Sequence, residues 1–195
     1  MATQDDFAAL WRRIVLRVAE IAPGDAAEVG DPDASGLAEL ARAFGGAVPS
    51  DVVAYFSTVP RTPPHVRLLP FHSALVPGAA AAELRMRREI EQQVGTGELE
   101  PDAGDMAWAW GDAFIPLSTD TMGNTYFVDL RPGPMHGCIK EYDHEQGALY
   151  DPEWPSLEAM LEAVASALET GGVVGDGRPD VDDGRLDWTP VSAEQ

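Results

Sequence analysis

Five side chains between positions 129 and 144 are of the types that acid–base or metal chemistry uses. They are three carboxylates and two imidazoles, namely Asp129, His136, Glu141, Asp143 and His144. Oxygen and imidazole ligands of this kind can hold a divalent metal ion, and a histidine can act as a general base near neutral pH. One alternative function is therefore a metal-dependent hydrolase that uses His136, His144 and the nearby carboxylates.

The same residues also have an ordinary structural interpretation. His136 follows a Pro-Gly-Pro turn and His144 follows an expected strand end, and both are common surface positions. Asp143 and Glu145 can simply pair with a protonated His144. The sequence contains no G-x-S-x-G, Walker A, G-x-G-x-x-G or H-E-x-x-H motif, and its single cysteine excludes a C-x-x-C pair. We therefore expect no catalytic residue, no bound metal and no cofactor.

The residues around these side chains predict two antiparallel strands. Residues 125–130 (TYFVDL) are rich in β-branched and aromatic side chains, and residues 137–142 (GCIKEY) form the next expected strand. The Arg-Pro-Gly-Pro stretch between them favours a hairpin. A further turn precedes the first strand, where the side chains of Asp120 and Asn124 can bond the local backbone.

The order of motifs across this region resembles the SUKH superfamily. The motifs are FIPLSTD, GNTYFVDLRPGP, HGCIKEYDHE and WPSLEAML, preceded by LAELA and GGAVPSDVVAYF. The resemblance covers roughly residues 22–171. This superfamily includes fungal regulators of cell-wall assembly and many bacterial immunity proteins. The resemblance therefore implies an α+β fold and a protein-binding function without catalysis.

The chain departs from the family pattern at one loop. After the tyrosine-bearing helix the family usually has a short Asn/Asp-Gly turn, whereas this chain continues STVPRTPP. This insertion, residues 57–64, contains a proline loop from Pro60 to Pro64 and lies where a partner-facing loop is expected. Its role in recognition, and that of the acidic C-terminal segment, is left open by the sequence.

Charge strongly limits the class of partner. The formal net charge is −20 and the sequence pI is near 4.3. Such a protein repels nucleic-acid phosphates and anionic membranes, so we expect no direct nucleic-acid or membrane partner. A basic protein is favoured instead, because opposite potentials speed encounter and suppress wrong partners. An acidic surface also simply keeps a protein soluble, which is the competing interpretation.

Resemblance and charge together predict an immunity protein that sequesters a cognate toxin, and a nuclease with a basic cleft would be a fitting target. The alternative within the same resemblance is a regulatory or scaffold protein of cell-wall or envelope assembly. The candidate partner-binding residues are those nearest the motifs: Trp110, Asp120, Asn124, Asp129, Glu141, Asp143 and His144. For Asp120 and Asn124, a structural role in their turn competes with partner contact.

Hydrophobic periodicity supplies the remaining elements. Helices are expected at residues 5–21, 36–44, 51–57, 79–94 and 157–169, and a strand at residues 66–71. We predict an α+β fold in which N-terminal helices and a C-terminal helix pack on a mostly antiparallel sheet of about four to six strands.

Residues 1–170 are expected to form a single domain. Residues 171–195 have the composition of a disordered or loosely docked acidic tail, with Trp188 as its one anchor. No apolar run approaches the ~20 residues that a membrane helix needs. With no signal-peptide pattern and one cysteine, Cys138, a cytoplasmic location is expected.

Overall fold

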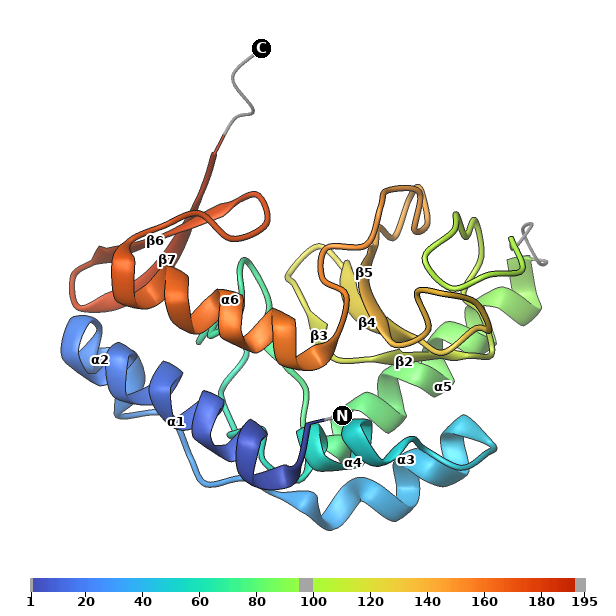
Figure 1. Ribbon diagram of the computed structural model, residues 1–195, viewed down its shortest axis with the longest axis horizontal. Coiled ribbons are helices and arrows are strands. Elements are labelled where there is room, and N and C mark those ends of the chain that lie inside the picture. Colours follow the sequence, from blue (N-terminus) through green and yellow to red (C-terminus); the bar gives the residue numbers. More distant parts are fainter. Residues whose placement is uncertain (1, 95–99, 192–195) are drawn as a thin grey trace.

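Helices frame three small antiparallel sheets in the computed structural model, which describes residues 2–94 and 100–191 (Figure 1). The α-helices are α1 (Gln4–Ile21), α2 (Pro23–Ala26), α3 (Leu37–Phe44), α4 (Ser50–Phe56), α5 (Pro77–Val94) and α6 (Leu157–Thr170), with a 3₁₀ turn at Ala34–Gly36. The strands are β1 (Ser73–Ala74), β2 (Phe114–Pro116), β3 (Ser118–Thr119), β4 (Thr125–Asp129), β5 (Cys138–Tyr142), β6 (Gly177–Asp182) and β7 (Arg185–Pro190). The predicted α+β class is confirmed.

The predicted hairpin lies at the centre of the fold as β4 and β5. Their register runs from Thr125 opposite Tyr142 to Asp129 opposite Cys138. β2 pairs with the other edge of β4, which gives the order β2-β4-β5, while β1 pairs with β3. Within the described residues the strands divide among sheets of two, three and two strands, and every pairing is antiparallel. The antiparallel pairing was predicted, but the single sheet of about four to six strands is wrong.

Apolar stripes on the two terminal helices explain how they pack. The stripe on α1 runs through Phe7, Leu10, Trp11, Ile14 and Val18, and all five side chains are buried. α6 buries a matching stripe, and Ser156 caps its first turn by accepting the N–H of Ala159. The two helices lie side by side in Figure 1 although they are far apart in the sequence. At their surface Arg13 bridges Glu162 and Glu169.

The prediction of a strand at residues 66–71 is wrong. Val66, Leu68 and Leu69 are buried as a strand pattern suggests, but the chain turns within this segment. Pro70 has no N–H to donate to a ladder, and Phe71 has a φ of 59°, which no regular strand contains. Pairing begins only at β1.

The expectation of a disordered or loosely docked tail is wrong for residues 171–191, while residues 192–195 lie outside the described structure. β6 and β7 form a hairpin whose two-residue turn, Asp183–Gly184, has positive φ at both positions, as the favoured hairpin turns require. β7 buries Leu186 and Trp188 on one face. The Trp188 indole donates to the carbonyl of Arg67 at 2.9 Å, so the hairpin is docked on the domain.

We expect Trp188→Ala to lower the free energy of unfolding by about 3–5 kcal/mol, because it removes a large buried side chain and leaves a cavity. Urea denaturation followed by circular dichroism measures the change. Val181→Thr in the same hairpin, at an exposed position, is the matched control and should change stability by less than about 0.5 kcal/mol. Equal stability of Trp188→Ala and the wild type would contradict a docked hairpin.

Candidate partner-binding site

Trp110 is buried, so the prediction that it contacts a partner is wrong. Its ring packs against Phe114, Phe127 and Tyr142 at centroid distances of 5.3–5.7 Å. The Arg87 guanidinium lies 5.3 Å from the same ring. Trp110 lies next to the motifs in the sequence, but its indole packs against side chains of β2, β4 and β5 instead of facing solvent. Trp108, two residues earlier, is 55% exposed.

Asp129 is also wrong as a partner-binding residue, because its side chain has no exposed surface. Its carboxylate accepts the N–H of Gly104 at 3.0 Å and the backbone N–H of Arg131 at 3.1 Å. The Arg131 guanidinium adds two further donors, with Nη2 at 2.7 Å and Nε at 3.0 Å. A buried carboxylate must be paired and hydrogen-bonded, and this one is.

Two buried cations next to Asp129 fasten the loop that runs from residue 100 to residue 106. Arg131 donates to the carbonyls of Glu100, Asp105 and Met106. Lys140 Nζ donates to the carbonyls of Gly104 at 2.8 Å and Asp105 at 2.6 Å. Burial, together with the nearby Arg131 charge, lowers the pKa of Lys140. The loop is therefore held to the hairpin through its backbone.

The other predicted residues gather where β4 begins and β5 ends. Asp120 accepts the N–H groups of Met122 and Asn124 at 2.8 and 2.7 Å, so its expected turn role is confirmed. Asn124 Oδ1 accepts the backbone N–H of His144 at 3.1 Å, which ties two turns together. Asp143 accepts the N–H groups of residues 145 and 146. Of these side chains, that of His144 lies at an exposed position.

Glu141 belongs to a polar chain that sequence reasoning did not find. It bonds His72 Nε2 at 3.1 Å, and His72 Nδ1 contacts Ser118 Oγ at 3.1 Å. His72 is 1% exposed and stacks on Tyr126 at 3.9 Å. The order Ser-His-Glu is that of a nucleophilic triad, but Ser118 has no exposed surface and already accepts the Tyr126 N–H. No substrate can reach this hydroxyl, so we interpret the chain as structural.

The surface beside Glu141 carries further negative charge. Burial, followed by the charges of Asp176 and Glu141, raises the pKa of Glu153. Burial and the same acidic neighbourhood raise the pKa of Tyr126 well above its usual value. The carboxylates of Glu141, Glu153 and Asp176 therefore lie close enough to influence one another's ionisation.

The histidines of the alternative hydrolase site do not meet. His136 precedes β5 and contacts the Arg131 carbonyl at 2.9 Å, whereas His144 follows β5 at its other end. A five-residue strand separates them by on the order of 15 Å. Within the described residues, no group of three or more His, Cys, Asp or Glu side chains has the geometry to hold a metal ion.

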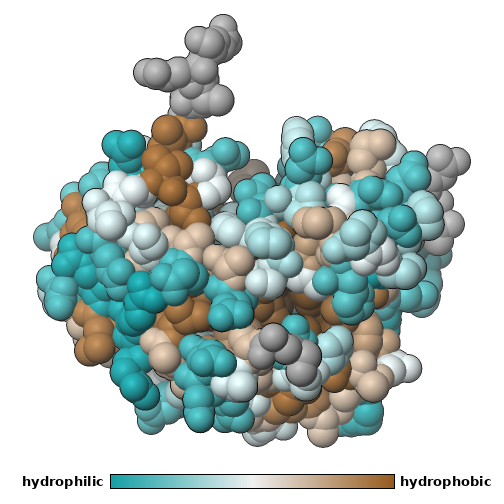
Figure 2. All heavy atoms as spheres, in the orientation of Figure 1, coloured by the Kyte–Doolittle hydropathy of each residue, from teal (hydrophilic) through white to brown (hydrophobic). Residues whose placement is uncertain are grey.

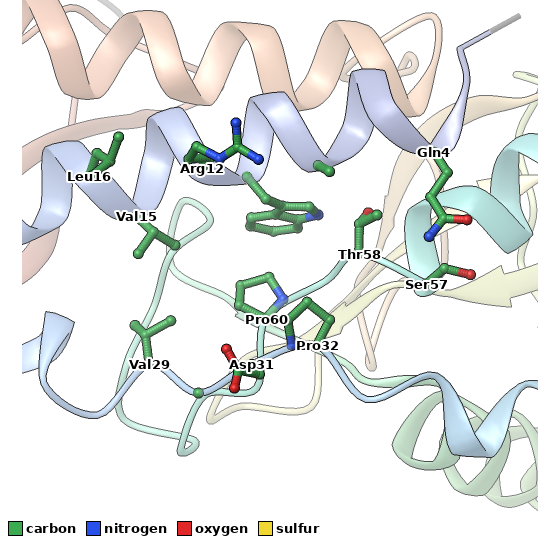
Figure 3. Close-up of a pocket in the computed structure, with 13 residues that line it drawn as sticks. Gln4, Arg12, Val15, Leu16, Val29, Asp31, Pro32, Ser57, Thr58 and Pro60 are labelled. Carbon is green, nitrogen blue, oxygen red and sulfur yellow. The ribbon is translucent and has the colours of Figure 1, made fainter.

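A separate hollow of about 570 Å³ lies between α1 and the loops at residues 29–32 and 57–60. Figure 3 shows Val15 on α1 pointing towards Val29, with Pro32 and Pro60 on the loops below the helix. Pro60, the first proline of the insertion, is buried, whereas Pro64 at its end is exposed. Trp11 also lines this hollow, and within the described residues its indole Nε1 has no hydrogen-bond partner.

No protein-family model and no curated protein matches the chain. The SUKH resemblance therefore stays a prediction from its motifs. In the described part of the chain, no helix combines the length and the hydropathy that crossing a membrane would require.

We expect Asp129→Asn to destabilise the fold by about 3–5 kcal/mol, because Arg131 would remain buried without its counter-charge. Chemical denaturation at neutral pH tests this. Asp112→Asn is the matched control, since its side chain is 99% exposed and should change stability by less than about 0.5 kcal/mol. If the Asp129→Asn variant were as stable as the wild type, the buried ion pair with Arg131 would be contradicted.

Cys138 is expected to be inert in the folded protein. Burial, followed by the charge of Asp129, raises the pKa of its thiol to about 11, so at pH 8 roughly one molecule in a thousand carries the reactive thiolate. A thiol-reactive dye should therefore label the native protein at least about tenfold more slowly than the urea-unfolded chain. Complete labelling at equal rates in both states would show that the thiol is accessible.

Proposed function

We propose that the protein is a non-catalytic immunity protein of the SUKH type, which sequesters a basic toxin domain through an acidic surface. The motif order around β4 and β5 supports the family, and the net charge of −20 supports a positively charged partner. In this mechanism carboxylates occupy the positions that substrate phosphates would take in the toxin's cleft.

The observation that carries the proposal is how the chain uses its few cations. Within the described residues, 11 of the 13 lysine and arginine residues form an ion pair with a carboxylate or donate to a backbone carbonyl of the same chain, and Arg12 and Arg178 are the exceptions. The 33 aspartates and glutamates far outnumber them, so most surface carboxylates face solvent without a cation. Hydrophilic residues cover most of the face seen in Figure 2.

This distribution affects the rate and the specificity of binding. An uncompensated negative surface attracts a basic partner over a distance of about one Debye length and repels acidic competitors. Affinity then depends on contacts that the charges do not provide, because exposed ion pairs contribute little stability individually. A partner-binding protein of this type needs an apolar anchor within its acidic field.

The test is an affinity isolation from the native host at low salt, followed by identification and purification of each basic protein recovered. The binary complex is then rebuilt from pure components. Co-expression shows whether the acidic protein relieves toxicity of the recovered one. Relief of toxicity supports immunity, whereas a stable complex with a harmless envelope protein would favour the regulatory alternative. Failure to form any binary complex would overturn both.

We expect the dissociation constant of the rebuilt complex to rise on the order of tenfold between low and moderate salt, because salt screens the long-range attraction. Calorimetric titration across a salt series measures it, and most of the change should lie in the association rate. Affinity that is independent of salt would contradict recognition by charge.

A further inference from the structure

Three large apolar side chains, Met106, Trp108 and Tyr150, are exposed within two residues of the bridge that joins Ala107 to Ala148. Their exposed fractions are 45%, 55% and 68%. Between the first two, Ala107 is buried and forms an antiparallel bridge with Ala148, with N–O distances of 3.1 and 2.7 Å. Met106 and Trp108 flank this buried residue, and both side chains reach solvent. We call these three residues the Trp108 patch.

A hollow lies next to the Trp108 patch, and Met106 and Tyr150 belong to both. Its volume is about 310 Å³, and it is lined by Glu100, Gly104, Asp105, Met106, Leu149, Tyr150 and Asp151. Met106, Leu149 and Tyr150 provide apolar walls, while the three carboxylates form the rim. Within the described residues, none of these three carboxylates takes part in an ion pair with a cation of its own chain.

The Trp108 patch is displayed on a fastened backbone. Arg131 and Lys140 hold the carbonyls of the preceding loop from beneath, as described above. On its other side the chain approaches Gly147 so closely that a Cβ there would lie 2.5 Å from the Ala107 carbonyl oxygen. Much of the ordering entropy of this surface is therefore lost on folding, before any partner arrives, which favours binding.

We propose that the Trp108 patch and its acidic hollow are the docking surface for a basic segment of a protein partner, one that carries an apolar side chain between lysines or arginines. The apolar side chain covers the exposed indole, and a cation with its aliphatic stem enters the hollow between Met106 and Tyr150. Charge complementarity selects this occupant, because the three rim carboxylates have no ion-pair partner among the described residues. The nearby cations, Arg131 and Lys140, are buried beneath the loop and donate to its backbone carbonyls instead. The inference rests on the proposed function for the identity of the partner.

The surface can be tested without knowing the partner. The ¹⁵N-labelled protein has five tryptophans, whose indole N–H resonances are assigned with Trp108→Phe and Trp11→Phe. The probe is a synthetic peptide in which lysines flank one leucine. We expect the Trp108 indole resonance to shift saturably with this peptide. A glutamate-flanked leucine peptide and a lysine peptide without leucine are the controls and should shift it far less.

Variants then measure the contribution of the anchor. Trp108→Ala should weaken binding of the lysine–leucine peptide by roughly tenfold or more, as for a hot-spot aromatic residue. Leu16→Ala is the matched control, because Leu16 is 59% exposed but lies on α1 at the other hollow. It should change the affinity less than about twofold. Circular dichroism shows that both variants are folded.

Two results would overturn the proposal. One is a shift of the Trp11 indole with Trp108 unaffected, which would place the docking surface in the α1 hollow. The other is no shift of any indole resonance at saturating peptide. Neither result depends on whether a toxin exists in the host, so failure of this surface is distinguishable from failure of the proposed function.

Discussion

The need to pair one buried carboxylate organises the centre of the molecule. Asp129 ends β4 with no exposed surface, and leaving its charge unpaired there would be strongly destabilising. Arg131 meets that need from the turn that follows, and its remaining donors have to be satisfied in turn. The carbonyls of residues 100–106 satisfy them, with Lys140 holding the same loop. One charge thereby fixes a hairpin, its turn and a neighbouring loop in a single arrangement.

Sequence predictions succeed where the signal is local and fail where a residue's role depends on distant parts of the chain. Helices α1 and α6 and the β4–β5 hairpin were predictable because their signals are local: apolar periodicity, a serine cap and a Pro/Gly turn. The role of Asp129 was not predictable, because its burial depends on the path of a loop that lies 25 residues away from it in the sequence. The hydrogen bonds of His72 were not predictable for the same reason, because its partners Ser118 and Glu141 lie 46 and 69 residues away in the sequence.

The two remaining errors have different physical causes. Trp110 was predicted to contact a partner because it precedes the motifs, but regular pairing does not continue past Ala107, and the indole turns inward against the β2-β4-β5 sheet. The C-terminal segment was misjudged from its average composition. Leu186 and Trp188 alternate with polar residues there, and Asp183–Gly184 is a strong hairpin turn, so a pattern of period two was present within a polar stretch.

Asp25 couples the two ends of the described chain. Its buried carboxylate, at the end of α2, accepts the N–H of Leu186 at 2.7 Å and pairs with Arg185, both in β7. α1 likewise packs against α6. During synthesis on the ribosome, the N-terminal helices therefore emerge long before the residues that complete their surroundings. Contacts of such large sequence separation slow folding, so the nascent chain must keep the apolar face of α1 from aggregating until α6 and β7 have emerged.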